Sequence, residues 1–206
     1  MRPRLRSIVA TLVTVLAFAG TAKIARADGN VMPPSANPHG YSLTDMAAAV
    51  ANFSISGNDT SFLPTTPFQI IYNRPGRTFT VKPGTPLYLK FFFIDDSEPV
   101  IGDWPETAED AADYVFGRDQ LGGHDLEVVV DGKASSLDDA GYIGGPVATP
   151  DSPDGSAHLI QIGAFVTPLA NGTHTITIRG VFDGDAILDA FGGPFAAEIT
   201  YTVNVR

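Results

Sequence analysis

Alternation of apolar and polar positions is the strongest regular pattern in this chain, and it predicts β-strands. Residues 78–82 and 197–205 alternate strictly, so each segment has one apolar and one polar face. Residues 87–94 are apolar on both faces apart from Lys90, which is typical of a central strand buried between two layers. Further strands are predicted at residues 68–72, 125–130, 158–166 and 173–182, with a hairpin turn at Asp131-Gly132.

Two segments replace this alternation with helical spacing. Ser42 or Thr44 is placed to cap a short helix that ends at the turn residues 56–58, and its apolar face comprises Leu43, Met46, Ala47 and Val50. In the second segment Thr107 and Asp110 resemble a capping pair, followed by a stripe of Ala108, Ala111, Ala112 and Val115. Residues 134–156 and the Gly- and Asp-rich segment after residue 182 are expected to be loop and turn.

About seven strands with turn signals between them and little helix predict an all-β fold, an antiparallel β-sandwich. A β-barrel is the alternative. We expect a single domain over residues 42–206. Residues 28–41 are rich in Pro, Asn and Gly, which predicts a flexible N-terminal lead-in.

The first 27 residues have the pattern of a signal peptide. Arg2, Arg4 and Arg6 form a basic start, and residues 8–20 form an uncharged, mostly apolar run. Small residues then stand at both positions that signal peptidase reads, in Ala25-Arg26-Ala27. This predicts cleavage before Asp28 and a secreted or periplasmic protein. Lys23 and Arg26 keep an uncleaved N-terminal anchor open as the alternative.

Removal of residues 1–27 leaves a strongly acidic chain. It retains eight Lys and Arg against 23 Asp and Glu, a formal net charge of −15. Such a surface repels nucleic acid and anionic lipid headgroups, so neither nucleic-acid binding nor membrane insertion after leader cleavage is expected. It suits a solvated exported protein, a cationic partner or a divalent metal ion.

The chain contains no cysteine, which excludes disulfides, thiolate nucleophiles and Cys-based metal sites. It also has no Gly-x-Ser-x-Gly motif, phosphate-binding loop or dinucleotide fingerprint. No catalytic residue and no cofactor-binding residue is therefore assigned from the sequence.

The last third of the chain carries a resemblance. Residues 167–178, TPLANGTHTITI, and residues 199–205, ITYTVNV, resemble the final strand pair of bacterial immunoglobulin-like sandwiches. With Pro83-Gly84, residues 87–94, an acidic helical insertion and Asp131-Gly132-Lys133, the arrangement is similar to uncharacterised secreted bacterial proteins. The resemblance implies an immunoglobulin-like fold and export, and it implies no catalytic residues.

The segment from residue 95 to residue 127, here called the acidic insertion, is the strongest candidate for chemistry. It holds eleven carboxylates and one Lys or Arg, namely Arg118. Calcium takes six to eight oxygen ligands, and the best subset for such a site is Asp95, Asp96, Glu98 and Asp103. The alternative is a solvated acidic face, which we favour because no Asp-x-Asp-x-Asp-Gly loop is present.

The remaining candidates are weaker. A second acidic group, Asp183, Asp185 and Asp189, is explained by turn chemistry between two strands. The four histidines are scattered without ligand spacing: His39, His124, His158 and His174. Trp104, the single tryptophan, either stacks on a sugar or a partner, or holds the acidic insertion against the domain.

Two functions follow from these observations. The favoured one is an exported, non-enzymatic protein with a binding or structural role, which contacts an unidentified protein or glycan through the acidic insertion. The alternative is a secreted hydrolase, acting on carbohydrate with carboxylates near Trp104.

Overall fold

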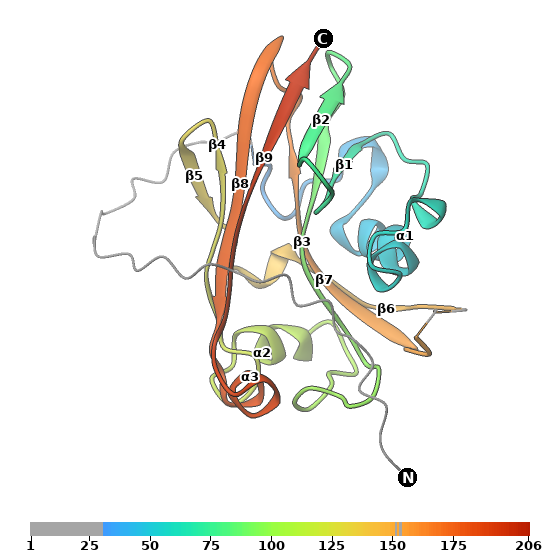
Figure 1. The fold of residues 1–206 in the computed structure, drawn as a ribbon. Coiled ribbons are helices and arrows are strands. Elements are labelled where there is room, and N and C mark those ends of the chain that lie inside the picture. The colour runs from blue at the N-terminus through green and yellow to red at the C-terminus, as the bar shows by residue number, and fades with distance from the viewer. Residues whose placement is uncertain (1–30, 151, 153) are drawn as a thin grey trace.

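The computed structural model describes residues 31–150, 152 and 154–206. The predicted signal peptide lies outside these residues. The described part contains two β-sheets, three α-helices and short 3₁₀ turns, and Figure 1 shows the two sheets as facing layers. No helix in this part is both long enough and apolar enough to cross a bilayer.

One sheet has four strands in the order β1-β3-β7-β6 and the other has five in the order β2-β9-β8-β4-β5. The strands are β1 (Gln69–Ile71), β2 (Thr78–Val81), β3 (Leu87–Asp95), β4 (Gly123–Val130), β5 (Lys133–Ser136), β6 (Ile143–Ala148), β7 (His158–Val166), β8 (Gly172–Phe182) and β9 (Phe195–Val205). Their buried side chains form one large apolar cluster that includes residues of both sheets. The mainly β fold is confirmed, and the two separate sheets are not closed into a barrel.

The expected all-antiparallel pairing is wrong, because β1 pairs in parallel with β3 and β2 pairs in parallel with β9. Successive short strands run in opposite directions, but the chain crosses between the sheets after β1 and again after β2. As a result β1 and β3, which run in the same direction, become neighbours. The alternation pattern predicted each strand without showing which sheet it joins.

Helix α1 (Leu43–Ile55) forms where helical spacing predicted it and begins with a capping box. The Ser42 hydroxyl accepts a hydrogen bond from the Asp45 backbone N–H at 3.1 Å, and the Asp45 carboxylate accepts one from the Ser42 N–H at 2.8 Å. The helix packs on β6 and β7, on the side of the four-stranded sheet that faces away from the other sheet (Figure 1). The four-stranded sheet is therefore covered on both faces.

Strand β3 is an inner strand of its sheet, as predicted, but its burial is uneven. Leu87, Tyr88, Leu89 and Lys90 are buried, whereas Phe91, Phe92 and Phe93 are only half-buried. The register with β7 shifts between Lys90 and Phe92, which marks a β-bulge. The neighbouring strand β1 pairs only with Leu87–Leu89, so the second half of β3 has a strand on one side alone.

Two segments that were expected to be loop or turn contain regular structure. Residues 133–148 contain β5 and β6, and helix α3 (Asp185–Phe191) lies between β8 and β9. Glycine and proline in β6 made it resemble a loop. Gly144 is required there because a Cβ atom would collide with the backbone carbonyl of Leu43 in α1.

The predicted lead-in lies against the domain where it is described. Val31 forms an antiparallel bridge with Val166, and the Met32 N–H donates to the Phe165 carbonyl at 2.8 Å. Further along, the rings of His39 and Tyr41 contact the Phe68 ring edge-on. Residues 31–41 are thus packed against the rest of the domain.

Candidate functional site in the acidic insertion

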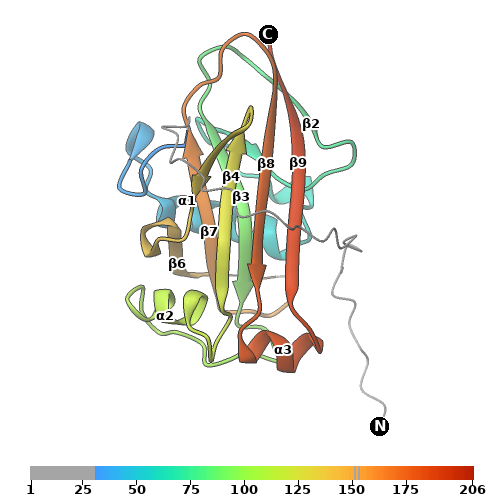
Figure 2. The ribbon, with the colours of Figure 1, turned by 90° about the vertical axis from the view of Figure 1, so that its left-hand side faces the viewer.

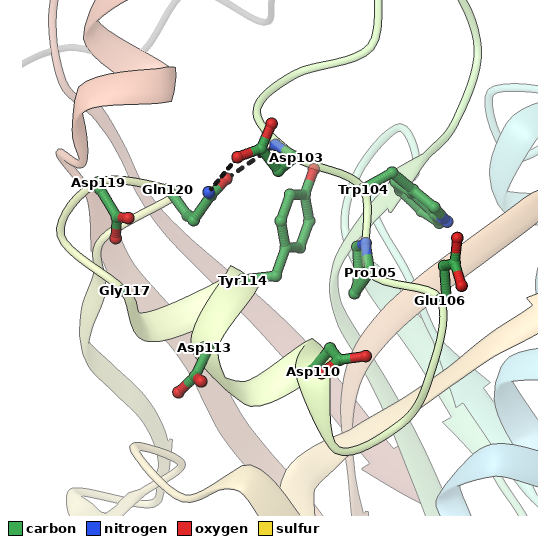
Figure 3. Close-up of a pocket in the computed structure, with 10 residues that line it drawn as sticks. All are labelled: Asp103, Trp104, Pro105, Glu106, Asp110, Asp113, Tyr114, Gly117, Asp119 and Gln120. Carbon is green, nitrogen blue, oxygen red and sulfur yellow. Dashed lines mark hydrogen bonds between the residues drawn. The ribbon is translucent and has the colours of Figure 1, made fainter.

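The acidic insertion folds into an open hollow of about 490 Å³ at the end of the molecule where helix α2 (Asp110–Phe116) lies. One wall is the loop of residues 103–106, and the other is α2 with the segment that follows it, as Figure 3 shows. Tyr114 rises from α2 between the two walls. The lining residues are Asp103, Trp104, Pro105, Glu106, Asp110, Asp113, Tyr114, Gly117, Asp119 and Gln120.

Hydrogen bonds between the walls fix the shape of the hollow. The Tyr114 hydroxyl donates to the Ile101 carbonyl at 2.6 Å. The Gln120 amide bonds Asp103 twice: its oxygen accepts from the backbone N–H at 2.9 Å, and its NH₂ donates to the carboxylate at 3.2 Å (Figure 3). These contacts join residues far apart in the sequence, so the hollow is a defined part of the fold.

Five carboxylates surround this hollow, and all belong to exposed residues: Asp103, Glu106, Asp110, Asp113 and Asp119. No Lys or Arg is among the lining residues. The nearest cation in sequence, Arg118, donates instead to the Asp183 carboxylate at 3.0 Å. The hollow therefore presents uncompensated negative charge beside two aromatic side chains.

Trp104 has one of the two roles considered for it, that of holding the acidic insertion against the domain. Its ring packs against the apolar core and meets the Tyr114 ring edge-on, with 5.7 Å between the centroids. The indole thus holds the insertion against the domain. Because Trp104 is only half-buried and lines the hollow, part of its ring is also available to a ligand.

The four carboxylates predicted to form a calcium site do not converge. Asp95 accepts hydrogen bonds from the backbone N–H and hydroxyl of Ser97, at 3.1 and 2.5 Å, and burial raises the pKa of its carboxyl. Asp103 lies at the hollow, where it bonds Gln120. Across the described residues, no three His, Asp or Glu side chains meet as a metal ion would require.

Asp96 has a structural role at the start of β7. Its carboxylate accepts hydrogen bonds from the backbone N–H groups of Ala157 and His158, at 2.7 and 2.9 Å, and lies 2.9 Å from the His158 Nδ1. Burial opposes ionisation of this carboxyl, but the hydrogen bonds from His158 and Ala157 outweigh it and lower the pKa of Asp96. A carboxylate bound in this way joins two strands and has little freedom to bind an ion.

The second acidic group is also divided between different elements. Asp183 pairs with Arg118 and lies 3.6 Å from the His124 Nε2. Asp185 and Asp189 lie on α3, which replaces the expected turn. A seven-residue helix between glycines shows too little periodicity to be recognised in the sequence.

His174 also has local partners. His174 Nδ1 lies 2.6 Å from the Asp131 carboxylate, and its Nε2 lies 2.8 Å from the Ala170 carbonyl. The hydrogen bond with Asp131 raises the pKa of His174. This pair attaches the β4–β5 hairpin to β8, so His174 is a structural residue, as the sequence suggested.

Sequence reasoning passed over Lys90, although it was visible as the single charge in an apolar strand. Its side chain is buried beneath α1, where Nζ donates to the Ser54 hydroxyl at 3.1 Å and lies 4.6 Å from the centroid of the Phe93 ring. No carboxylate of the described residues forms a salt bridge with it. Desolvation lowers the pKa of Lys90 to about 7.

Comparison with known proteins gives little to set beside this geometry. No protein-family model matches the chain, and no curated protein matches it. A solved structure described as the solution structure of amebosin is 14% identical and covers 68% of this chain and 100% of its own, with a TM-score of 0.27. A similarity that low carries no argument about fold or function.

Proposed function

We propose that this protein is an exported, non-enzymatic binding protein with an immunoglobulin-like sandwich, and that the hollow in the acidic insertion receives a cationic group of its partner. The observation that carries the proposal is the placement of five exposed carboxylates around one hollow beside the Trp104 and Tyr114 rings. Carboxylates attract a cation over several ångströms, and the exposed part of the Trp104 ring adds a cation–π contribution at contact, whereas Tyr114 is buried. A basic segment of a protein has this chemistry.

The hydrolase alternative has less support from the same geometry. A carboxylate pair that hydrolyses a glycoside needs one carboxyl kept protonated near neutral pH, and burial is the usual means of raising its pKa. The five carboxylates around the hollow belong to exposed residues. Asp95, whose pKa burial raises, is bonded to Ser97 and is not among the residues that line the hollow.

The hollow can be tested with spermine, a small polycation that has no peptide backbone. Trp104 is the single tryptophan of the chain, so intrinsic fluorescence reports directly on this site. We expect a saturable change in the emission as spermine is added, with an affinity that falls as salt is raised, because the contacts are between exposed charges.

Asp113→Asn and Asp189→Asn form a matched pair for this test. Both residues are exposed aspartates on seven-residue helices, but only Asp113 lines the hollow. We expect Asp113→Asn to weaken spermine binding about two- to fivefold, as for loss of one exposed charge contact, and Asp189→Asn to leave it unchanged. A fluorescence titration without saturation, or an equal effect of both substitutions, would contradict the proposal.

Export is part of the proposal and rests on the basic start, the apolar run and the Ala25-Arg26-Ala27 site. Intact-mass measurement of the protein recovered from its native host tests it. We expect a mature chain that begins at Asp28. A mass that retains residues 1–27 would show that this segment stays attached as an anchor.

A further inference from the structure

Part of strand β9 has no neighbour on one side. Strand β8 pairs with β9 along its whole length, whereas β2 pairs only with residues 202–205. Among the described residues, nothing pairs with the β2 side of residues 195–201. Figure 2 shows this half of β9 at the margin of its sheet.

The backbone groups of this free edge can be assigned from the pairing with β2. The Thr202 N–H donates to the Arg77 carbonyl at 2.9 Å, so even-numbered residues of β9 direct their N–H and C=O groups toward the β2 side. Ala196, Glu198 and Thr200 therefore present their backbone groups at the free edge. Such a row is a template for one more strand.

The second half of β3 also has no neighbouring strand on its β1 side, but it is protected against the addition of a strand. It contains the bulge between Lys90 and Phe92, and Lys90 points beneath α1 as an inward-facing charge. Bulges and inward-facing charges are devices that block strand addition. The free part of β9 has no bulge in its register with β8 and contains no proline or lysine.

An apolar groove of about 100 Å³ lies beside the free edge of β9. It is formed by residues of β3, β8 and β9, which include Phe91, Phe92, Phe195, Ala197 and Ile199. Phe195 is 38% exposed and the nearby Phe191, at the end of α3, is 48% exposed. A strand added to β9 would cover this groove with every second side chain.

Charged side chains on the outer face of the sheet indicate which charge would suit a strand added beside β9. Glu127 of β4, Arg179 of β8 and Glu198 of β9 are direct cross-strand neighbours in one row. Arg179 donates through Nε and Nη2 to the Glu127 carboxylate, at 2.8 and 2.6 Å. Glu198, the last residue of the row, has no ion pair among the described residues, so a cation on the next strand would complete the alternation.

We infer that residues 195–201 of β9 are a docking edge for an extended segment of a partner protein, in which apolar residues alternate with Lys or Arg. The apolar residues enter the groove, a basic residue faces Glu198, and the backbone bonds Ala196, Glu198 and Thr200. Strand addition of this kind obtains affinity from the main chain and specificity from alternate side chains. A second copy of this chain fits less well, because it would bring two acidic edges together.

A capped peptide that alternates valine and lysine tests this inference on the full chain, with a valine–glutamate peptide as its counterpart. Amide hydrogen exchange measured by NMR reports on the edge residue by residue. We expect the valine–lysine peptide to slow exchange of the Ala196, Glu198 and Thr200 amides about tenfold or more. The valine–glutamate peptide should leave these amides unprotected.

Glu198→Lys should reverse this preference, so that the glutamate peptide protects the edge and the lysine peptide does not. Glu109→Lys makes the same charge change at an exposed turn residue just before α2, and it should leave the preference unaltered. Three results would overturn the inference: no protection at millimolar peptide, equal protection by both peptides, or amides already protected in the peptide-free chain. Protection in the peptide-free chain would mean that residues 1–30 already occupy the edge. If sedimentation also shows a dimer, a second copy of the chain would be the occupant.

Discussion

Lys90 shows how one residue links burial to pH dependence. It is 7% exposed, and its polar contact is the hydroxyl of Ser54, which in turn lies 3.4 Å from the Gln161 side-chain oxygen. These neutral groups compensate a buried ammonium poorly, so the neutral amine becomes accessible near pH 7. The folded protein therefore gives up a proton that the unfolded chain retains up to its ordinary pKa near 10.5.

We expect the free energy of unfolding to rise between pH 7 and pH 10, because in this range the unfolded state binds the proton on Lys90 and the folded state does not. The slope for one proton is at most about 1.4 kcal/mol per pH unit. Lys90→Met should remove this slope and be more stable than the natural protein at pH 7, with a difference that shrinks toward pH 10. Urea titrations over this pH range measure it.

The exposed Lys82 provides the control, since Lys82→Met removes a lysine that loses little hydration on folding. We expect that variant to keep the slope of the natural protein. A slope that persists in Lys90→Met would show that another group releases the proton.

The pair of His174 and Asp131 predicts a second pH dependence with the opposite direction. The pKa of His174 is raised, mainly by its hydrogen bond with Asp131, so its stabilising effect is complete below about pH 6.5 and is lost as pH rises through the raised pKa. We expect His174→Gln to be most destabilising near pH 5–6 and least destabilising at high pH. Thermal unfolding over pH 5–9 measures the difference.

Asp131→Asn should abolish this pH dependence, because it removes the carboxylate that favours the imidazolium. At the acid end the pair weakens again, since the pKa of Asp131 is lowered and its contribution disappears as pH falls through that value. A destabilisation by His174→Gln that does not vary between pH 5 and pH 9 would contradict a charged pair.

At the scale of the element, β3 shows how an apolar sequence can be buried unevenly. If residues 87–94 were buried on both faces throughout, Phe91→Ala would cost about 3–5 kcal/mol of unfolding free energy. Phe91 instead lines the groove beside β9 and is half-buried, whereas Leu89 is 1% exposed. Both halves of residues 87–94 are apolar apart from Lys90, but only the first half has β1 as a neighbour.

We therefore expect Leu89→Ala to cost about 2–5 kcal/mol, the usual range for a buried leucine, and Phe91→Ala to cost about 1–2 kcal/mol, as for a partly exposed position. Denaturant titration of the two variants tests the order. A larger loss for Phe91→Ala would place the groove inside the closed core and would remove the opening that the added strand requires.

At the scale of the whole molecule, the acidic charge is distributed over separate elements and does not converge on one ion. Asp95 and Asp96 are bonded at the end of β3, Asp103 lies at the hollow, and Asp183 pairs with Arg118. We expect melting curves in millimolar CaCl₂ and in NaCl of equal ionic strength to coincide, because screening is then the common effect. A rise of several degrees in calcium alone, abolished by Asp96→Asn, would establish a calcium site.

Local sequence patterns determined most of the elements of this protein. The capping residues and apolar face of α1, the alternation in β2, β8 and β9, and the Asp131-Gly132 hairpin all depend on neighbours within a few residues, and all are confirmed. Elements that depend on distant contacts were missed. Strand β6 pairs with β7 and carries glycine where α1 approaches it closely, and α3 is too short to show a period.

Tertiary structure alone decided which residues meet. The sequence placed eleven carboxylates in one segment, but only the fold brings five of them around the Trp104 hollow and directs Asp96 to His158. Likewise, alternation predicted β9, and only the short reach of β2 leaves half of its edge unpaired. Hydrophobic periodicity reports which face of a segment is buried, whereas sheet order, register and convergence of side chains depend on packing between segments far apart in the chain.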